Sequence, residues 1–242
     1  MVAGLPVELN THNGGFDYPV QYADGSLGCT TFTDARYYNQ TDKYCVPNPP
    51  GGFKPSYGGW GADDGHLVIV DQAAHTYYDF WKFNVDAQGR PVSTDVGKIT
   101  RGNLDGDGNP GTTAAGITGL AGDILPGELD CATCLNHALS IIVPGTMNSP
   151  QLGRQAPVQK TDGSVGGAIF REGAKIRFDP SIDVNSLPVS TAVKAVMRAL
   201  QLYGGVITDQ TGGHNIGIYT ALPTVPDVAG INQIAAHLFL YN

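Results

Sequence analysis

The protein has 242 residues, a formal net charge of −8 and an apolar fraction of 41%. This acidity, with no run of Lys or Arg, argues against a nucleic-acid partner, which needs a basic face. No stretch approaches the roughly 20 apolar residues of a membrane span, so no transmembrane segment is expected.

The first part of the chain, residues 1–60, is irregular and rich in Gly, Pro, Tyr and Asp. Over the whole sequence, 33 glycines, 16 prolines and an excess of aspartate over glutamate favour turns over long helices. We therefore expect residues 1–60 to wrap, as loops and short strands, around a β-rich core formed by residues 61–242. The whole chain, 1–242, is then a single domain.

Four cysteines occur, Cys29, Cys45, Cys131 and Cys134. An even number in a Gly- and Asp-rich chain is compatible with an oxidising compartment, which predicts a secreted or extracellular protein. The simplest of the three possible connectivities pairs neighbours along the chain. Free thiols and a zinc site are the alternatives.

A β-hairpin is predicted over residues 66–83, where an apolar arm is followed by the most aromatic segment of the chain. Strand alternation puts Asp79 and Trp81 on one face and Tyr78 and Phe80 on the other. If Phe80 faces the core, Trp81 is exposed and can stack on a sugar ring beside Asp79. The alternative is that Trp81 itself lies in the core.

Apolar patterns and turn residues predict the later elements. Strands are expected at residues 94–100, 137–143, 173–178, 205–209 and 214–219, a helical turn at 125–130, and either helix or strand at 231–241. One amphipathic helix is predicted at 191–203. Its buried stripe is Val193, Val196, Met197, Leu200 and Tyr203. These elements indicate a mainly β, jelly-roll-like β-sandwich with one well-formed α-helix and long loops.

Five motifs, taken in order, carry a resemblance. They are Asp64-Gly-His66, Tyr78-Asp-Phe-Trp81, Asn136-His-Ala-Leu139, Gly173-Ala-Lys-Ile-Arg-Phe178, and Ala199-Leu-Gln-Leu-Tyr-Gly204 leading to Asp209. Together they resemble a set of secreted bacterial and fungal β-sandwich proteins, mostly uncharacterised, that look related to jelly-roll polysaccharide-active proteins. The resemblance covers residues 60–220 and implies secretion and a β-rich fold. The Glu-x-Asp-x-Glu signature of laminarinase-like hydrolases is missing. So are the Arg-x-Glu-Leu-Arg and Gln-Ile-His strands of a common alginate lyase type, and neither mechanism is carried over.

Carboxylates and imidazoles at predicted strand ends are the candidate catalytic groups. They are Asp64, His66, Asp79, His137 and Asp209. Such groups serve as general acid, general base or nucleophile when they face a substrate. Each also has a structural alternative, because turn aspartates and hydrogen-bonded histidines are common at strand ends. We expect these strand ends to converge on one cleft.

Aromatic and basic side chains are the candidate substrate-binding groups. They are Trp60, Tyr78, Trp81, Arg171, Arg177 and His214. For Arg171 the alternative is a surface ion pair with Glu172. No cofactor is expected to be required. Asp105, Asp107 and Asn109 match the opening of a calcium loop, but Gly116 stands where the EF-hand pattern has its last ligand. A structural calcium and a simple acidic turn both remain open.

These residues predict a secreted carbohydrate-active enzyme that cleaves glycosidic bonds of a polysaccharide or oligosaccharide. A hydrolase would use two carboxylates that flank the bond. A lyase would use a histidine or Tyr78 as base and an arginine to neutralise a uronate. The acidic net charge favours the hydrolase. The alternatives are a non-catalytic carbohydrate-binding module and a cell-surface or structural assembly protein. The sequence does not indicate the oligomeric state.

Overall fold

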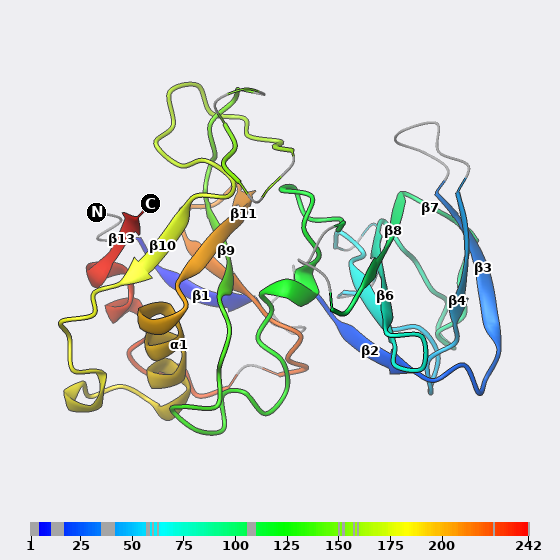
Figure 1. The fold of residues 1–242 in the computed structure, drawn as a ribbon, viewed down its shortest axis with the longest axis horizontal. Helices are drawn as coiled ribbons and strands as arrows, with labels where there is room; N and C mark the ends of the chain where they lie inside the picture. Colours follow the sequence, from blue (N-terminus) through cyan, green and yellow to red (C-terminus); the bar gives the residue numbers. More distant parts are fainter. Residues whose placement is uncertain are drawn as a thin grey trace.

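The structure is a computed structural model that describes residues 5–10, 17–34, 42–56, 59, 61, 63–105, 110–149, 151, 153–156, 158, 160–224 and 226–241. These residues form three β-sheets and one α-helix, so the expectation of a mainly β, sandwich-like fold is confirmed. Figure 1 shows two lobes. The C-terminal lobe contains the six-stranded sheet and the helix, and the N-terminal lobe contains the two smaller sheets.

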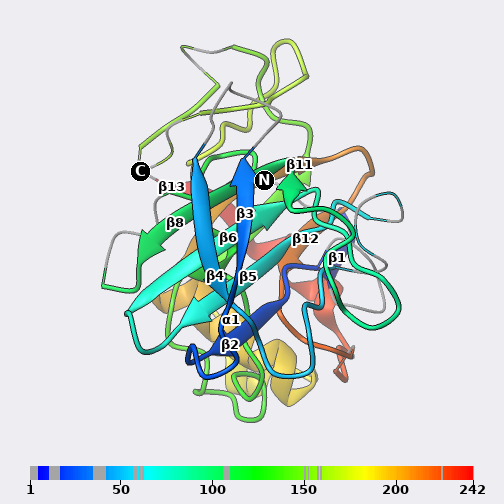
Figure 2. The same ribbon diagram turned by 90° about the vertical axis from the view of Figure 1, so that its right-hand side faces the viewer.

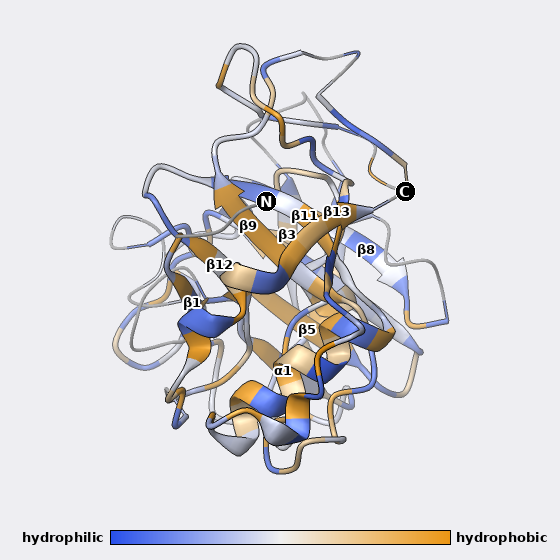
Figure 3. Ribbon diagram, turned by 90° about the vertical axis from the view of Figure 1, so that its left-hand side faces the viewer, coloured by the Kyte–Doolittle hydropathy of each residue, from blue (hydrophilic) through white to orange (hydrophobic). Residues whose placement is uncertain are grey.

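The C-terminal lobe is built on one sheet with the helix packed against it. In sheet order its strands are β1 (Val7–Asn10), β12 (Ile216–Tyr219), β9 (Leu139–Pro144), β11 (Gly205–Thr211), β10 (Lys175–Phe178) and β13 (Leu238–Tyr241). The central strands are strongly apolar (Figure 3), and their side chains share one core with α1 (Thr191–Leu202).

The predicted helix is confirmed almost to the residue. The Ser190 hydroxyl caps its N-terminus by accepting a hydrogen bond from the Val193 amide, at 3.3 Å. The helix ends before Gly204, whose φ of +74° is favourable only for glycine. The predicted stripe is buried except for Tyr203, which is 42% exposed. Tyr203 was wrongly assigned to the core because it is the C-terminal cap residue, where the helical repeat stops.

The N-terminal lobe is a sandwich of two sheets. One has the order β2 (Val20–Ala23), β5 (Leu67–Asp71), β6 (Thr76–Trp81), β8 (Lys98–Asn103), and the other the order β4 (Lys43–Pro47), β3 (Cys29–Asp34), β7 (Asp95–Val96). In Figure 2, β3 and β4 cross in front of β5 and β6. A cluster of phenylalanines, including Phe32, Phe80 and Phe83, packs edge to face between the sheets. The β5–β6 pair is the predicted hairpin.

The two lobes are joined by a separate apolar cluster. Val68 and Val70 of β5 and Tyr77 of β6 pack with Ile142 of β9 and Tyr219 of β12. Leu67 and Ile69 of β5 face the phenylalanine cluster, so the apolar part of this strand is buried on both sides. A strand covered on both faces reads as a continuous apolar run, which is why Leu67–Val70 shows no alternation. This cluster joins the facing surfaces of the two lobes.

The structure differs from the sequence-based predictions in several local elements. Residues 94–100 divide between β7 and β8, and 125–130 form hydrogen-bonded turns rather than a helical turn. The C-terminal segment contains short 3₁₀ turns at Ile231–Gln233 and Ala235–His237 before β13. Further 3₁₀ turns lie at Gly119–Ala121 and Val184–Ser186. Four strand pairs are parallel, β1 with β12, β9 with β11, β2 with β5, and β3 with β7, which the sequence pattern did not indicate.

Both predicted disulfides are present. Cys29–Cys45 joins β3 to β4, and Cys131–Cys134 closes a turn before β9. Disulfides persist in oxidising compartments, so an extracellular location is compatible with the structure. Among the described residues, no helix has the length and apolar character needed to cross a membrane.

Candidate active site

Two adjoining hollows lie along the junction of the lobes. One has a volume of about 440 Å³ and is lined by residues that include Asp64, His66, Trp81 and Asp209. The other, of about 350 Å³, lies toward β12 and the turn that precedes it. Both hollows are lined by Asp64, Asp209 and Gln210, so they meet at these residues. We call the two hollows together the cleft.

Asp209 faces the cleft because β11 contains a β-bulge. Ile207 pairs with Ile141 of β9, and both lie in the core beneath α1. The register then shifts, and Asp209 pairs with Ile142, which belongs to the cluster between the lobes. Strict alternation would put Asp209 on the same face as Ile207. The extra residue, Thr208, turns the Asp209 carboxyl toward the cleft.

The Asp209 carboxyl is held by several donors and is largely screened from water. Its Oδ2 accepts a hydrogen bond from the Tyr219 hydroxyl at 3.0 Å, and its Oδ1 accepts one from the Gln210 amide at 2.8 Å. Burial, and then the nearby Asp162 carboxylate, raise the pKa of Asp209 to about 7. Asp209 can therefore hold or release a proton near neutral pH.

Asp64 approaches the cleft from the N-terminal lobe, in the turn that leads into β5. The Asp63 carboxylate accepts a hydrogen bond from the Asp64 backbone amide at 2.5 Å, and the Asp64 carbonyl accepts one from the Lys82 backbone amide at 2.9 Å. Burial and then Asp63 raise the pKa of Asp64, whereas a hydrogen bond from the Trp81 indole and the charge of Lys82 favour the carboxylate. The carboxyls of Asp64 and Asp209 thus lie in the same cleft in different environments.

His66 forms part of the floor of the cleft and is neutral. Its ring stacks on Tyr18 with centroids 4.2 Å apart, and Nδ1 lies 3.4 Å from Thr112 Oγ1. Burial lowers the pKa of His66 to about 3, although the Phe80 carbonyl accepts a hydrogen bond from the imidazole. Because the ring stays uncharged over the usual pH range, His66 can offer a fixed polar edge but cannot act as an acid.

A buried network supports this floor. Asp79 is fully buried, and its Oδ1 accepts hydrogen bonds from Tyr18 at 2.7 Å and from the Thr112 hydroxyl at 2.5 Å. Asp123 is also fully buried, and among the described residues its carboxyl oxygens have no hydrogen-bond partner. Burial raises the pKa of Asp123 well above its usual value, so the group is held neutral. The outward orientation expected for Asp79 is wrong, because the C-terminal lobe covers that face of β6.

Glu172 is another carboxyl with a raised pKa. It is buried, and its Oε1 accepts a hydrogen bond from the Thr146 hydroxyl at 3.0 Å. Burial, followed by the charge of Asp162, raises the pKa of Glu172 to about 8. The Gln210 side chain fixes this region, since it donates to the Asp162 carbonyl at 2.9 Å and accepts from the Thr146 amide at 3.1 Å. The alternative of a surface ion pair between Arg171 and Glu172 is wrong.

Several predicted site residues lie away from the residues that line the cleft. His137 is half-buried and contacts Glu128 at 3.1 Å, Tyr78 packs in the phenylalanine cluster, and Arg177 donates to the Gln201 carbonyl at 2.8 Å. Arg171 and His214 are exposed. Of the predicted residues, Asp64, His66, Trp81 and Asp209 line the cleft together, and Asp79 lies beneath it.

Three of the predicted site residues lie outside the described residues: Trp60, Asp107 and Asn109. The predicted calcium loop is therefore described only through Asp105, which is exposed. Within the described part of the chain, no group of three or more His, Cys, Asp or Glu side chains is arranged to hold a metal ion.

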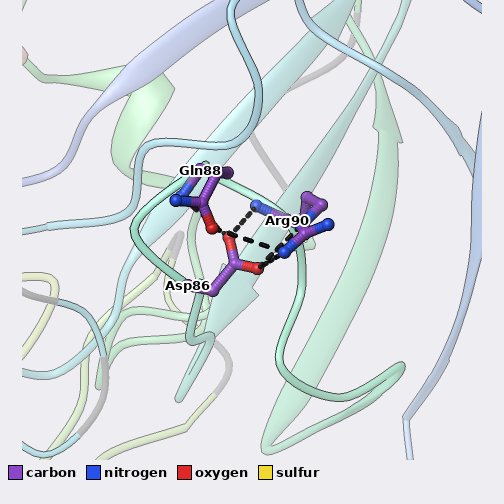
Figure 4. A network of polar contacts seen from close by, with 3 residues as sticks. All are labelled: Asp86, Gln88 and Arg90. Atoms are coloured by element: carbon purple, nitrogen blue, oxygen red, sulfur yellow. Dashed lines mark hydrogen bonds and ion pairs between the residues drawn. The ribbon is translucent and has the colours of Figure 1, made fainter.

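A hollow larger than either part of the cleft lies elsewhere. It has a volume of about 650 Å³ and is bounded in part by the turn that carries Asp86 and Gln88. Figure 4 shows that the Asp86 carboxylate is occupied by Arg90, with an ion pair of 2.7 Å, and by the amides of its own turn. These hydrogen bonds lower the pKa of Asp86. Asp86 therefore has a lowered pKa at this hollow, whereas Asp209 in the cleft has a raised one.

Sequence reasoning missed several residues that line the cleft or lie close to it. They are Lys98, Thr112, Lys160, Asp162 and Gln210 in its wall, and Glu172 beside it. The scarcity of glutamate was the one available signal for Glu172, since the chain has only three. In comparisons with known proteins, no family model, no curated protein and no solved structure matches this chain.

Proposed function

We propose that the protein is a secreted hydrolase that cleaves glycosidic bonds of a polysaccharide. Asp209 is the proton donor to the leaving oxygen, and Asp64 is the opposing carboxylate. The observation that carries this proposal is the pKa of about 7 at Asp209, at the point where the two hollows of the cleft meet. A glycosidase needs one carboxyl that holds a proton and a second that is ionised, on either side of the bond.

The surroundings of each carboxyl support this division of roles. Burial and the charge of Asp162 keep the proton on Asp209, while the Tyr219 hydroxyl fixes its orientation. Asp64 receives a hydrogen bond from the Trp81 indole, which stabilises its charged form. The half-buried Trp81 ring also gives the cleft a flat apolar wall, against which the C–H face of a sugar can pack.

A cleft with two hollows suits a chain substrate. A polymer that passes through the cleft would occupy one hollow on each side of the residues that both share. The scissile bond would then lie beside Asp64 and Asp209. The two disulfides fit a protein that acts outside the cell on such a polymer.

The test is a screen of the purified protein against neutral and uronic-acid polysaccharides. Reducing ends and the ultraviolet absorbance of unsaturated products are measured on the same samples. Reducing ends alone, lost in Asp209→Asn, are expected. Both signals together would mean elimination and would reject the hydrolase. Binding without either signal would favour a non-catalytic carbohydrate-binding module.

A further inference from the structure

Two lysines in the cleft have no part in the proposed proton transfer. Lys98 comes from β8 in the N-terminal lobe, and Lys160 comes from the long connection before β10. Both line the hollow of about 440 Å³, together with His66 and Thr112. Burial and then the charge of Lys98 lower the pKa of Lys160, so the two ammonium groups are close enough to repel each other.

The lysines are held in this arrangement by backbone from one segment, residues 111–116. Lys98 Nζ donates to the Gly111 carbonyl at 3.3 Å. The stem of Lys160 lies against Gly116, where an added Cβ would be only 3.2 Å from Lys160 Cγ. Within the described part of the chain, Lys160 forms no ion pair or hydrogen bond that would occupy its ammonium group. Its charge is therefore available to a ligand.

The carboxyls around Lys160 do not fully neutralise it. Asp162, Asp209 and Glu172 all act on Lys160 electrostatically. Two of them are held in their neutral forms at weakly acidic pH, because their pKa values are about 7 for Asp209 and about 8 for Glu172. An anion placed between the lysines would relieve their repulsion and pair with the Lys160 ammonium group.

We propose that Lys98 and Lys160 form a subsite for an anionic substituent on a sugar ring, either a carboxylate or a sulfate. The substrate of the proposed hydrolase is then an acidic polysaccharide. The identification of the substrate rests on the proposed function, whereas the subsite itself requires only binding. The net charge of −8 disfavours long-range attraction of a polyanion, so this recognition is local to the cleft.

The subsite can be tested by amide NMR titration of ¹⁵N-labelled protein at weakly acidic pH. The probes are sodium glucuronate, glucose 6-sulfate and glucose. We expect at least one of the two anions, and not glucose, to shift the amides of Thr112, Ala114 and Lys160 saturably. Lys98→Met and Lys160→Met should each weaken that binding about tenfold, and Lys160→Arg should retain it. Lys175→Met, on β10, is the matched control and should bind like the wild type.

The other possible results separate a failure of the subsite from a failure of the proposed hydrolase. Equal shifts with glucose, no saturable shift with either anion, or binding that survives both methionine variants would overturn the subsite. The spectra themselves show whether each variant is folded. A protein that cleaves neutral glycans and ignores the anions would keep the hydrolase and lose the subsite. Lysine-dependent anion binding without cleavage of any polysaccharide would do the reverse.

Discussion

Asp86 and Asp209 are both aspartates, but their surroundings shift the pKa of the carboxyl in opposite directions. Asp86 lies in an exposed turn beside the larger hollow, where Arg90 and backbone amides stabilise its charge and lower its pKa. Asp209 lies in a smaller cleft, where burial and a neighbouring carboxylate raise its pKa to about 7. The volume of a hollow therefore does not locate chemistry. The balance of donors, burial and like charge around a carboxyl is the better guide.

The largest expected effect separates these two aspartates directly. Asp209→Asn keeps the size of the side chain and can still accept from Tyr219, but it cannot donate the proton to the leaving oxygen. We expect kcat/KM for the polysaccharide identified in the screen to fall by on the order of 10²–10⁴-fold. Asp86→Asn should leave the rate unchanged. Similar losses of kcat/KM in both variants, or no loss in Asp209→Asn, would contradict the role of Asp209 as the proton donor.

The pH dependence of the rate sharpens the same contrast. Asp209 donates a proton only below its pKa, so the rate should fall above about pH 7 by roughly tenfold per pH unit. Asp64 acts as a carboxylate and its pKa is raised from 3.8, so the acidic limb should lie above that value. The check is kcat/KM across this range. A rate that keeps rising through pH 8 would exclude Asp209 as the acid.

The sequence predicted the individual helices and strands better than the contacts between them. The helix at 191–202 and the β5–β6 hairpin follow from local periodicity, capping and turn residues, and both are confirmed. The alternation of β6 is also confirmed, since Tyr78 and Phe80 share one cluster while Tyr77 faces the other lobe. The pattern could not reveal that a second lobe covers the Asp79 face, because parallel pairs and lobe contacts join segments far apart in the chain.

The cleft was predicted in part for the same reason. Asp64, His66 and Trp81 come from one hairpin, so local sequence brought them together. Asp209 reaches them only because of the bulge at Thr208, which no local pattern indicated. Lys160 and Glu172 both come from the long connection between β9 and β10. Their roles depend on burial and on Gln210, which holds the connection in place.

The next prediction concerns stability. The surroundings of Glu172 and Asp86 predict opposite dependences of the free energy of unfolding on pH. Glu172 has a folded pKa of about 8 against an ordinary value of 4.5. Its stabilising contribution is therefore complete below pH 4.5 and is lost as the pH rises through about 8. Glu172→Gln should match the wild type near pH 4 and have a higher free energy of unfolding than the wild type near pH 9, by about 1–3 kcal/mol. Urea denaturation at the two pH values measures this difference.

Asp86 provides the matched control, with the opposite sign. Its pKa is lowered, so its contribution is present above the unfolded value of 3.8 and is lost as the pH falls through the folded value. Asp86→Asn should therefore be slightly less stable than the wild type at neutral pH and equal to it in strong acid. If Glu172→Gln were destabilised most at alkaline pH, Glu172 would have to be ionised and paired in the native protein.

The smallest expected effect tests the wall of the cleft and separates its two contributions. Trp81 offers a flat ring, over which Lys82 Nζ lies 4.5 Å from the centroid, and an indole N–H that hydrogen-bonds to Asp64. Trp81→Phe keeps a ring and loses the N–H, so the pKa of Asp64 should rise and the acidic limb of the rate should move upward. KM should change little. Trp81→Ala loses both, and KM should also rise about tenfold, the loss of roughly 1.4 kcal/mol of contact with the sugar. Equal KM values in the two variants would show that the ring does not contact the substrate, and Trp81 would then act only through Asp64.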